Sequence, residues 1–212
     1  DGVITIQFES GSSFEKAYWG YNDATSAIYG ARDYITIDGN SVGVIKCTDN
    51  GGSRTYQENS TGIYLNGDYN TIKNITVSDI YVYDSTAEDP DDGATAMPIY
   101  TAGSHVNIYG NTVDHGWKGI NLTYGDSEVD GNIYSNTITH VGVGISVGSS
   151  GGASNGLTGL KIYNNTIAMG DNFCGSAVHQ DGIHVFAKGG TAVHVTGLEI
   201  YNNIITRNVL CA

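Results

Sequence analysis

Two short hydrophobic strand patterns alternate along most of the chain. In the first, apolar and polar residues alternate, a turn containing asparagine follows, and a further apolar residue resumes the strand. Clear copies begin at Ile108, Ile133, Ile162 and Ile200. The second pattern is Gly-Ile followed by alternating residues, and it begins at Gly62, Gly119, Gly144 and Gly182, with a degenerate copy at Pro98. This recurrence predicts a repeat architecture built from short strands.

The interval between copies varies while the strand motifs stay constant. A weaker copy at Ile37 and an irregular one at Ile75 extend the series, and the intervals run from 25 to 38 residues. In the Ile75 copy, either Asn74 or Ser78 takes the asparagine position. Fixed strands joined by loops of variable length are typical of a parallel β-helix, because every coil must return to the same register.

Stacking the copies places equivalent residues above one another. Leu160, Ile162 and Ile167 point inward, whereas Lys161 and Tyr163 point outward, which is the period of a strand. The repeated asparagine sits at a sharp bend, where this residue tolerates the left-handed conformation. We therefore predict a buried amide ladder of Asn111, Asn136, Asn165 and Asn203. We also predict a parallel stack of Tyr109, Tyr134, Tyr163 and Tyr201.

Composition agrees with an all-β chain. The 212 residues include 30 Gly and 2 Pro, and no long helical pattern occurs. The net charge of −13 opposes an unaided role on nucleic acid or an anionic membrane, because phosphate binding needs clustered Lys and Arg. No apolar run is long enough to span a membrane, and the start at Asp1 fits a processed chain.

The repeats divide the chain into two parts. Residues 1–30 are predicted to form an atypical first coil or N-terminal cap, because terminal repeats usually differ from the rest. Residues 31–212 are predicted to form the parallel β-helix. Its C-terminus ends in strand-like sequence without a polar cap, and an uncapped strand edge invites pairing with another chain. Either the sequence is a piece of a longer chain, or subunits stack end to end, in the limit as a filament.

The Ile-x-x-Asn-x-Ile unit with its asparagine ladder resembles the right-handed parallel β-helix proteins of the pectate-lyase-like superfamily. The resemblance covers roughly residues 30–212 and implies a single right-handed parallel β-helix of about six to seven coils. His179-Gln180-Asp181-Gly182-Ile183 is similar to the Asn-Thr-Asp-Gly-Ile segment of polygalacturonases. In those enzymes the aspartate belongs to the acid/base set, and Asp181 matches it.

Alignment on the Gly-Ile strands gathers polar and aromatic residues on one face. The catalytic candidates are Asp181, Lys188, His184 and Lys118, and the substrate-binding candidates are Asn121, His179 and Phe186. A lysine with a lowered pKa would serve as the base of a polysaccharide lyase. A glycoside hydrolase would need a second carboxylate across the bond. The alternative is that Asp181 and His179 only fix a turn through local hydrogen bonds.

An acidic segment and two cysteines suggest further sites. Oxygen ligands from Glu88, Asp89, Asp91 and Asp92 would suit Ca²⁺, the only cofactor that the sequence indicates, and a solvated acidic loop is the alternative. Cys174 and Cys211 occupy nearly the same place in successive repeats. Neighbouring strands are close enough for a disulfide between them, and two free thiols are the alternative.

Two histidines form a column of their own. His115 and His140 each lie two residues after the second apolar residue of their repeat, so they can stack or share a metal ion. Stacking is favoured, because Met169 and Arg207 fill that column in later repeats.

These patterns lead to two functional hypotheses. The first is a secreted or cell-surface protein that binds or processes an acidic polysaccharide through the Asp181 face, as a lyase or glycoside hydrolase if it is an enzyme. The −13 charge opposes contact with an anionic polysaccharide unless Ca²⁺ bridges the two. The second is a non-catalytic structural or adhesive extracellular protein whose subunits self-associate. Neither hypothesis involves nucleic acid or membrane insertion.

Overall fold

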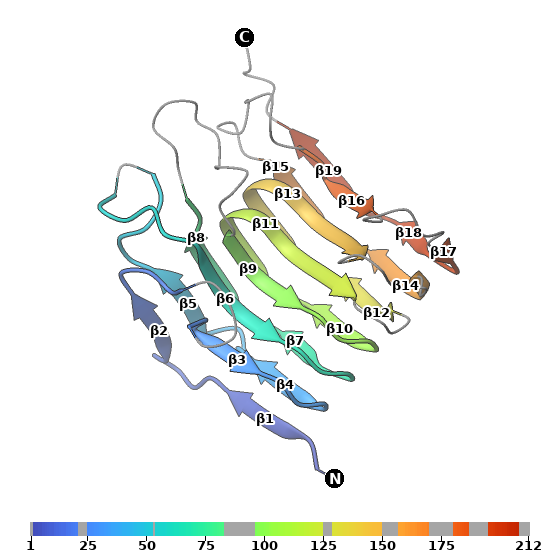
Figure 1. Cartoon of the computed structure of the whole chain (residues 1–212), viewed down its shortest axis with the longest axis horizontal. Coiled ribbons are helices and arrows are strands. Elements are labelled where there is room, and N and C mark those ends of the chain that lie inside the picture. The colour runs from blue at the N-terminus through green and yellow to red at the C-terminus, as the bar shows by residue number, and fades with distance from the viewer. Residues whose placement is uncertain are drawn as a thin grey trace.

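The computed structural model describes residues 2–20, 25–52, 54–82, 96–124, 129–149, 157–169, 180–186 and 195–207. These residues form strands and connecting turns, and every ladder between the strands is parallel. Within this part of the chain there is no helix that could cross a membrane. Figure 1 shows the strands succeeding one another in chain order from the blue end to the red end. The architecture is all-β and compatible with a β-solenoid.

An eight-stranded sheet carries the Ile-Tyr half of each repeat. Its strands are β1 (Ile4–Gln7), β4 (Ile35–Asp38), β7 (Thr71–Lys73), β10 (Val106–Tyr109), β12 (Val129–Tyr134), β14 (Leu157–Tyr163), β17 (Val195–Thr196) and β18 (Glu199–Tyr201). Strands β17 and β18 both pair with β14. Neighbours in this sheet therefore come from successive repeats.

An eleven-stranded sheet carries the rest of each repeat in two rows. The first row contains β2 (Ser13–Lys16), β5 (Val44–Cys47), β8 (Thr76–Ile80), β15 (Thr166–Met169) and β19 (Ile204–Arg207). The second row contains β3 (Ile28–Gly30), β6 (Ser60–Leu65), β9 (Ala96–Thr101) and β16 (Ile183–Phe186). Strands β11 (Thr112–Tyr124) and β13 (Thr137–Ser149) join the rows, because their first halves pair in one row and their second halves in the other.

The core lies between the eight-stranded sheet and the two rows of the eleven-stranded sheet, and it consists of columns of aliphatic side chains. Each column repeats one apolar position through successive strands, and its members are fully buried. The eight-stranded sheet contributes Ile37, Ile72, Ile108, Ile133 and Ile162, and the two rows contribute Ile45, Val77, Val113, Ile138 and Ile167, and Ile63, Ile99, Ile120 and Ile145. Burial of such side chains is the main stabilising contribution of the fold.

The predicted asparagine ladder is confirmed. Each amide nitrogen donates to the side-chain oxygen of the next asparagine at 2.9 to 3.0 Å, in the order Asn111, Asn136, Asn165 and Asn203. The same nitrogens donate to main-chain carbonyls of the preceding repeat, as Asn136 does to Ile108 at 3.0 Å. The side-chain oxygens also accept main-chain N–H groups. Buried amides thus hold one repeat to the next.

The left-handed residue of each bend is not the ladder asparagine but the residue before it. These residues have φ between 53° and 65° and are Asn74, Gly110, Ser135, Asn164 and Asn202. The positions favour asparagine and glycine, because residues without a bulky branched side chain enter this region at lower cost. Two consecutive residues therefore form the bend and the ladder: the first takes the left-handed conformation and the second contributes the buried amide.

The predicted tyrosine stack is also confirmed. Ring centroids are 4.8 Å apart for Tyr109 and Tyr134, 4.9 Å for Tyr134 and Tyr163, and 5.0 Å for Tyr163 and Tyr201. The planes differ by 12° or less. The spacing equals the separation of neighbouring strands, so the stack follows directly from the register.

The alignment of the second repeat on Ile75 is wrong. The residue opposite Ile37 and Ile108 is Ile72, which shifts this repeat by three positions. Neither Asn74 nor Ser78 occupies the ladder position. Ile75 does, with its main-chain N–H donating to Asn111 Oδ1 at 3.2 Å. The ladder of side-chain amides ends at Asn111, so the next position needs only a main-chain N–H donor. Isoleucine supplies this donor, and its side chain is almost fully buried.

The first 30 residues contribute strands to both sheets. Strand β1 pairs with β4, β2 with β5, and β3 with β6. The segment predicted as an atypical coil or cap therefore follows the same register as the repeats.

Replacement of Asn136 by alanine tests the ladder. It removes the side-chain amide, so the main-chain N–H of Asn111 loses its acceptor, the Ile108 carbonyl loses a donor, and Asn165 Oδ1 keeps only the main-chain N–H of residue 136. We expect the free energy of unfolding, measured by urea denaturation, to fall by roughly 3 kcal/mol or more. Asn132→Ala is the control, because Asn132 lies in the same repeat and donates one bond, to Asn107 at 3.0 Å. Equal losses in the two variants would contradict the assigned role.

Candidate functional site

The outward face of the second row forms one continuous column of polar and aromatic residues. Register places Tyr29, Tyr64, Tyr100, Asn121, Ser146 and His184 in consecutive strands. Tyr64 and Tyr100 stack with centroids 4.5 Å apart and planes 8° from parallel. The column thus changes from aromatic at the β3 end to polar at the β16 end, as the alignment of the Gly-Ile strands predicts.

Close packing requires the glycine that precedes the isoleucine in the Gly-Ile strands. A Cβ atom on Gly144 would lie 2.6 Å from Ile167 Cγ2 and 2.4 Å from the main-chain oxygen of Gly182. Gly182 is in the same position relative to Ile205, at 2.5 Å. Only glycine lets the chain pass so close to the core column of the next repeat. This close approach fixes where the outward face begins.

Lys118 is the most unusual residue of this face. Its Nζ lies 4.4 Å from the ring centroid of Trp117 and 5.5 Å from that of Phe186, so it faces two aromatic rings. Burial lowers the pKa of this ammonium group below the ordinary value for lysine. Among the described residues, no carboxylate forms an ion pair with it. Within the described part of the chain, this partly buried cation therefore has no charged partner.

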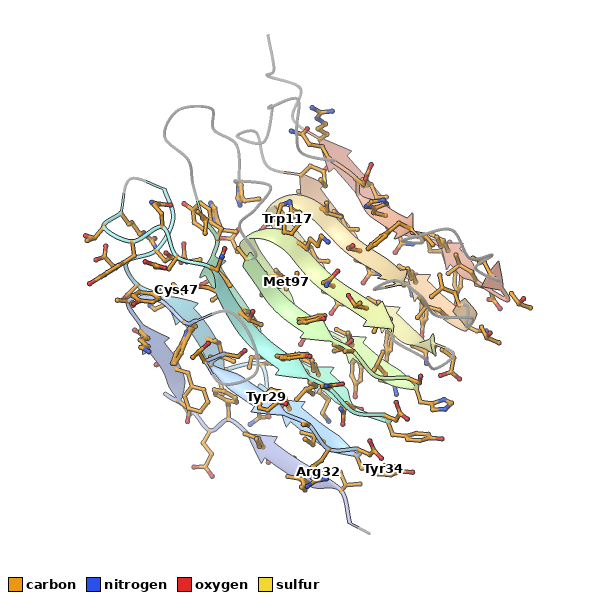
Figure 2. All side chains as sticks on the ribbon, viewed as in Figure 1. Tyr29, Arg32, Tyr34, Cys47, Met97 and Trp117 are labelled. Carbon is orange, nitrogen blue, oxygen red and sulfur yellow. The ribbon has the colours of Figure 1, made fainter. Side chains whose placement is uncertain are left out.

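Two buried polar atoms beneath the same face have no hydrogen-bond partner among the described residues. Asn121 is 2% exposed and donates to Thr123 Oγ1 at 3.1 Å and to Met97 Sδ at 3.3 Å, but its Oδ1 accepts no bond from the described residues. Ser146, fully buried in the next strand, has an unpartnered Oγ. Figure 2 labels Met97 and Trp117 on neighbouring strands of this face. Buried polar atoms are normally hydrogen-bonded, so these two are exceptions among the described residues.

Asp181, His184 and Phe186 lie at the β16 end of the face. Asp181 Oδ2 is 3.6 Å from His184 Nδ1, and the rings of His184 and Phe186 are 5.0 Å apart. Phe186 also covers the neighbouring strand, since a Cβ atom on Gly148 would lie 2.2 Å from its ring. A series of side-chain contacts therefore connects Asp181 to Lys118. Asp181 contacts His184, His184 contacts Phe186, and Phe186 contacts Lys118.

The described residues of the aligned columns contain a single acidic side chain, Asp181. Hydrolysis of a glycosidic bond ordinarily uses two carboxyl groups. The described part of this face therefore favours ligand binding or proton abstraction by lysine over a two-carboxylate hydrolase.

Other predicted site residues lie outside the described residues. They are His179 and Lys188 of the predicted face, Glu88, Asp89, Asp91 and Asp92 of the acidic segment, and Cys174 and Cys211 of the predicted disulfide. The remaining cysteine, Cys47, is buried and unpaired.

A second cluster lies at the start of β11 and β13. The rings of His115 and His140 stack at 4.6 Å, which confirms the favoured prediction for this pair. The reason given for it is wrong, because Met169 aligns with Val141 rather than with His140 after a register shift. Both rings also direct Nδ1 at Asp114, at 2.9 Å for His115 and 2.6 Å for His140.

Asp114 was not among the residues that the sequence singled out, and neither was Trp117. Burial would raise the pKa of the Asp114 carboxyl, but hydrogen bonds from His140, Thr139 and His115 outweigh it and lower this pKa. The sequence feature that could have identified Asp114 is its position directly before His115, in the histidine column. Its partners on the neighbouring strand could be recognised only once the strands were paired.

Comparison with known proteins finds no matching family model, no matching curated protein and no matching solved structure. The functional argument therefore rests on the geometry of the chain itself.

Replacement of Lys118 by methionine tests the burial of its charge. The lowered pKa means that the unfolded chain binds this proton more tightly, so the folded state is penalised until the pH rises through the folded pKa toward the ordinary value of about 10.4. We expect Lys118→Met to be more stable than wild type at pH 7, and the difference to shrink at alkaline pH. Urea denaturation at several pH values measures it.

Lys161→Met is the control for this comparison. Lys161 pairs with Glu199 at 3.1 Å on an exposed surface, where such a pair contributes little. A Lys118→Met protein less stable than wild type at pH 7 would show that the contacts with the two rings outweigh the burial of charge.

Proposed function

We propose that the face formed by β11, β13 and β16 binds an acidic polysaccharide. The observation that carries this proposal is Lys118, a partly buried cation held against Trp117 and Phe186 without a carboxylate partner among the described residues. An anionic sugar would supply that partner. Its carboxylate would pair with Nζ, and the apolar edge of its ring would pack against the aromatic side chains.

The neighbouring side chains support the same ligand class. His184 continues the outward column toward Asp181. Asn121 and Ser146 are 2% and 0% exposed, so they lie beneath the face and shape it rather than contact the sugar. Lysine, imidazole and aromatic groups on adjacent strands form a typical saccharide-binding set. The negative charge of the whole protein slows approach of such a ligand, so binding depends on this local cation.

The proposal includes a finer description of the fold. We infer a single right-handed parallel β-helix of about six to seven coils, similar to the pectate-lyase-like superfamily. Support comes from the parallel register of successive repeats and from the ladder of buried asparagines. Many proteins of this architecture act outside the cell, so a secreted or cell-surface location is part of the proposal.

In a lyase reaction Lys118 would act in its neutral form, a role separate from the ion pair proposed for binding, and its lowered pKa makes that form more abundant. The neutral amine would take the proton from the carbon next to the uronate carboxylate. The electrons of that C–H bond would form a carbon–carbon double bond, and the glycosidic oxygen would leave with its bonding pair and take up a proton. The products would be an unsaturated uronate end and a free hydroxyl on the other fragment. No oxidant or reductant is needed.

Binding to polygalacturonate and alginate, with dextran as the neutral comparison, tests the proposal. We expect calorimetric titration to show binding of the acidic polymers only. Lys118→Met should weaken this binding at least about tenfold, since a charge-assisted contact is worth about 1.5 to 3 kcal/mol. The affinity of wild type should fall as the pH rises through the lowered pKa of Lys118, because the neutral amine no longer attracts an anion.

Lys161→Met is again the control and should bind as wild type does. Ultraviolet absorbance of an unsaturated product would show lyase activity, which Lys118→Met should abolish. Undiminished binding by Lys118→Met, or equal binding of dextran, would reject this face as the site.

A second candidate is a structural protein that assembles end to end. Ile4 and Ile6 of β1 are 53% and 39% exposed, and Ile200, Ile204 and Ile205 at the other end are 47%, 60% and 49% exposed. Ile6, Ile200 and Ile205 continue core columns that are fully buried in the middle of the stack, whereas Ile204 aligns with the exposed Thr166. Exposed apolar positions on the outermost described strands favour addition of a second copy.

Sedimentation velocity over a range of protein concentrations distinguishes the two candidates. We expect self-association for the structural candidate, and Ile6→Lys, which places a charge in the exposed column, should suppress it. Ser10→Lys, on an exposed turn, is the control. A single monomeric species at all concentrations would reject assembly and leave the polysaccharide proposal intact.

A further inference from the structure

We propose that Asp114, His115 and His140 form a binding site for a divalent transition-metal ion of the zinc class. Their three ligand atoms lie within 4.8 Å of one another. The cluster uses none of the residues assigned to the Lys118 face, so the proposal does not depend on polysaccharide binding.

The main chain places the two imidazoles. Register pairs Asp114 with Thr139 and Gly116 with Val141, so His115 and His140 occupy the intervening position of adjacent strands. Both residues are left-handed, with φ of 60° and 52°. A left-handed conformation is uncommon for histidine and is repeated here in consecutive strands. The shared bend turns both side chains to the same side, where the rings stack at 15°.

The Asp114 carboxylate lies beside the two stacked rings and faces the Nδ1 atom of each. Asp114 Oδ2 is 2.9 Å from His115 Nδ1, and Oδ1 is 2.6 Å from His140 Nδ1. Thr139 Oγ1 donates to Oδ1 at 2.6 Å and orients the group, as partners of metal ligands commonly do. The ring of Tyr81 packs against His115 at 5.2 Å. Two nitrogens and a carboxylate oxygen thus converge, and neighbouring side chains hold them in place.

The donor set selects the class of ion. Two imidazoles and one carboxylate suit zinc and its neighbours among the transition metals, whereas Ca²⁺ and Mg²⁺ prefer oxygen ligands alone. A zinc ion bonded at about 2.0 to 2.2 Å keeps its ligand atoms roughly 3.2 to 3.5 Å apart. Side-chain shifts of about 1 Å would therefore complete the site. Side chains that are 59%, 36% and 34% exposed can make such shifts, and water can fill the remaining coordination positions.

Proton transfer accompanies binding. In the structure each Nδ1 faces a carboxylate oxygen and acts as the donor. On binding metal, a neutral imidazole would move its proton to Nε2, and an imidazolium would release one proton to solvent. The net charge of −13 favours the approach of a cation to this surface.

The chain contains a matched pair that lacks the second imidazole. His105 Nδ1 lies 2.6 Å from Asp130 Oδ1, and its ring stacks on Tyr69 at 4.3 Å. This pair has the same local chemistry as His140 with Asp114. It offers only one nitrogen, so it should bind transition metals weakly. A comparison of the two pairs separates a metal site from an ordinary carboxylate–imidazole contact.

Calorimetric titration of the untagged protein with ZnCl₂ tests the proposal, and the absorption spectrum of the Co²⁺ form reports the ligand set. We expect one saturable zinc site per protein molecule. The Co²⁺ form should show an absorption spectrum typical of coordination by nitrogen as well as oxygen atoms. His140→Gln and His115→Gln should each weaken zinc binding at least about tenfold, and Thr139→Val, which frees Asp114, about tenfold. His105→Gln should leave the affinity unchanged.

His140 is largely exposed, so its replacement should preserve the fold, which circular dichroism can verify. Absence of saturable zinc binding would overturn the proposal. So would wild-type affinity in His140→Gln, or an equal loss of affinity in His105→Gln. Asp114→Asn gives an independent check, because the amide is a poorer metal ligand of the same shape.

Discussion

The buried amide ladder is the interaction on which the rest of the structure depends. Each asparagine bonds to its equivalent in the next repeat and to main-chain groups on both sides, as Asn136 does with Asn111, Ile108 and Asn165. A shift of one residue would leave all of these groups buried without partners. The ladder therefore fixes the register of neighbouring strands, and the aliphatic columns and the tyrosine stack follow from that register.

Fixed register also explains how distant residues become neighbours. His115 and His140 are 25 positions apart in the chain but lie one strand apart, so their rings meet. Lys118 and Phe186 also come together across β13, but they belong to different columns, because register pairs Lys118 with Val143 and Phe186 with Gly148. In a column, most positions repeat a similar residue, and chemistry appears where the repetition is broken. Lys118 is such a break, because its partner in the next strand is Val143.

Strand β11 carries both unusual clusters within five residues, from Asp114 to Lys118. The bend at His115 and the close approach at Gly119 limit this short segment on its two sides. Side chains that the bend turns outward cannot enter the core, which is already filled by Val113 and Ile120. Polar and aromatic residues therefore gather on the surface here, and the long strands β11 and β13 supply most of them.

The sequence by itself determined the strand period, the asparagine and tyrosine columns, the histidine stack and the outward face of the Gly-Ile strands, because equal positions in successive repeats must lie above one another. It could not determine that Ile72 rather than Ile75 continues the core column, since both fit the apolar period. Nor could it show that the Asp114 carboxylate contacts both imidazoles or that Lys118 faces Trp117 and Phe186. Contacts between different columns depend on bends and on sheet curvature, which only the tertiary structure decides.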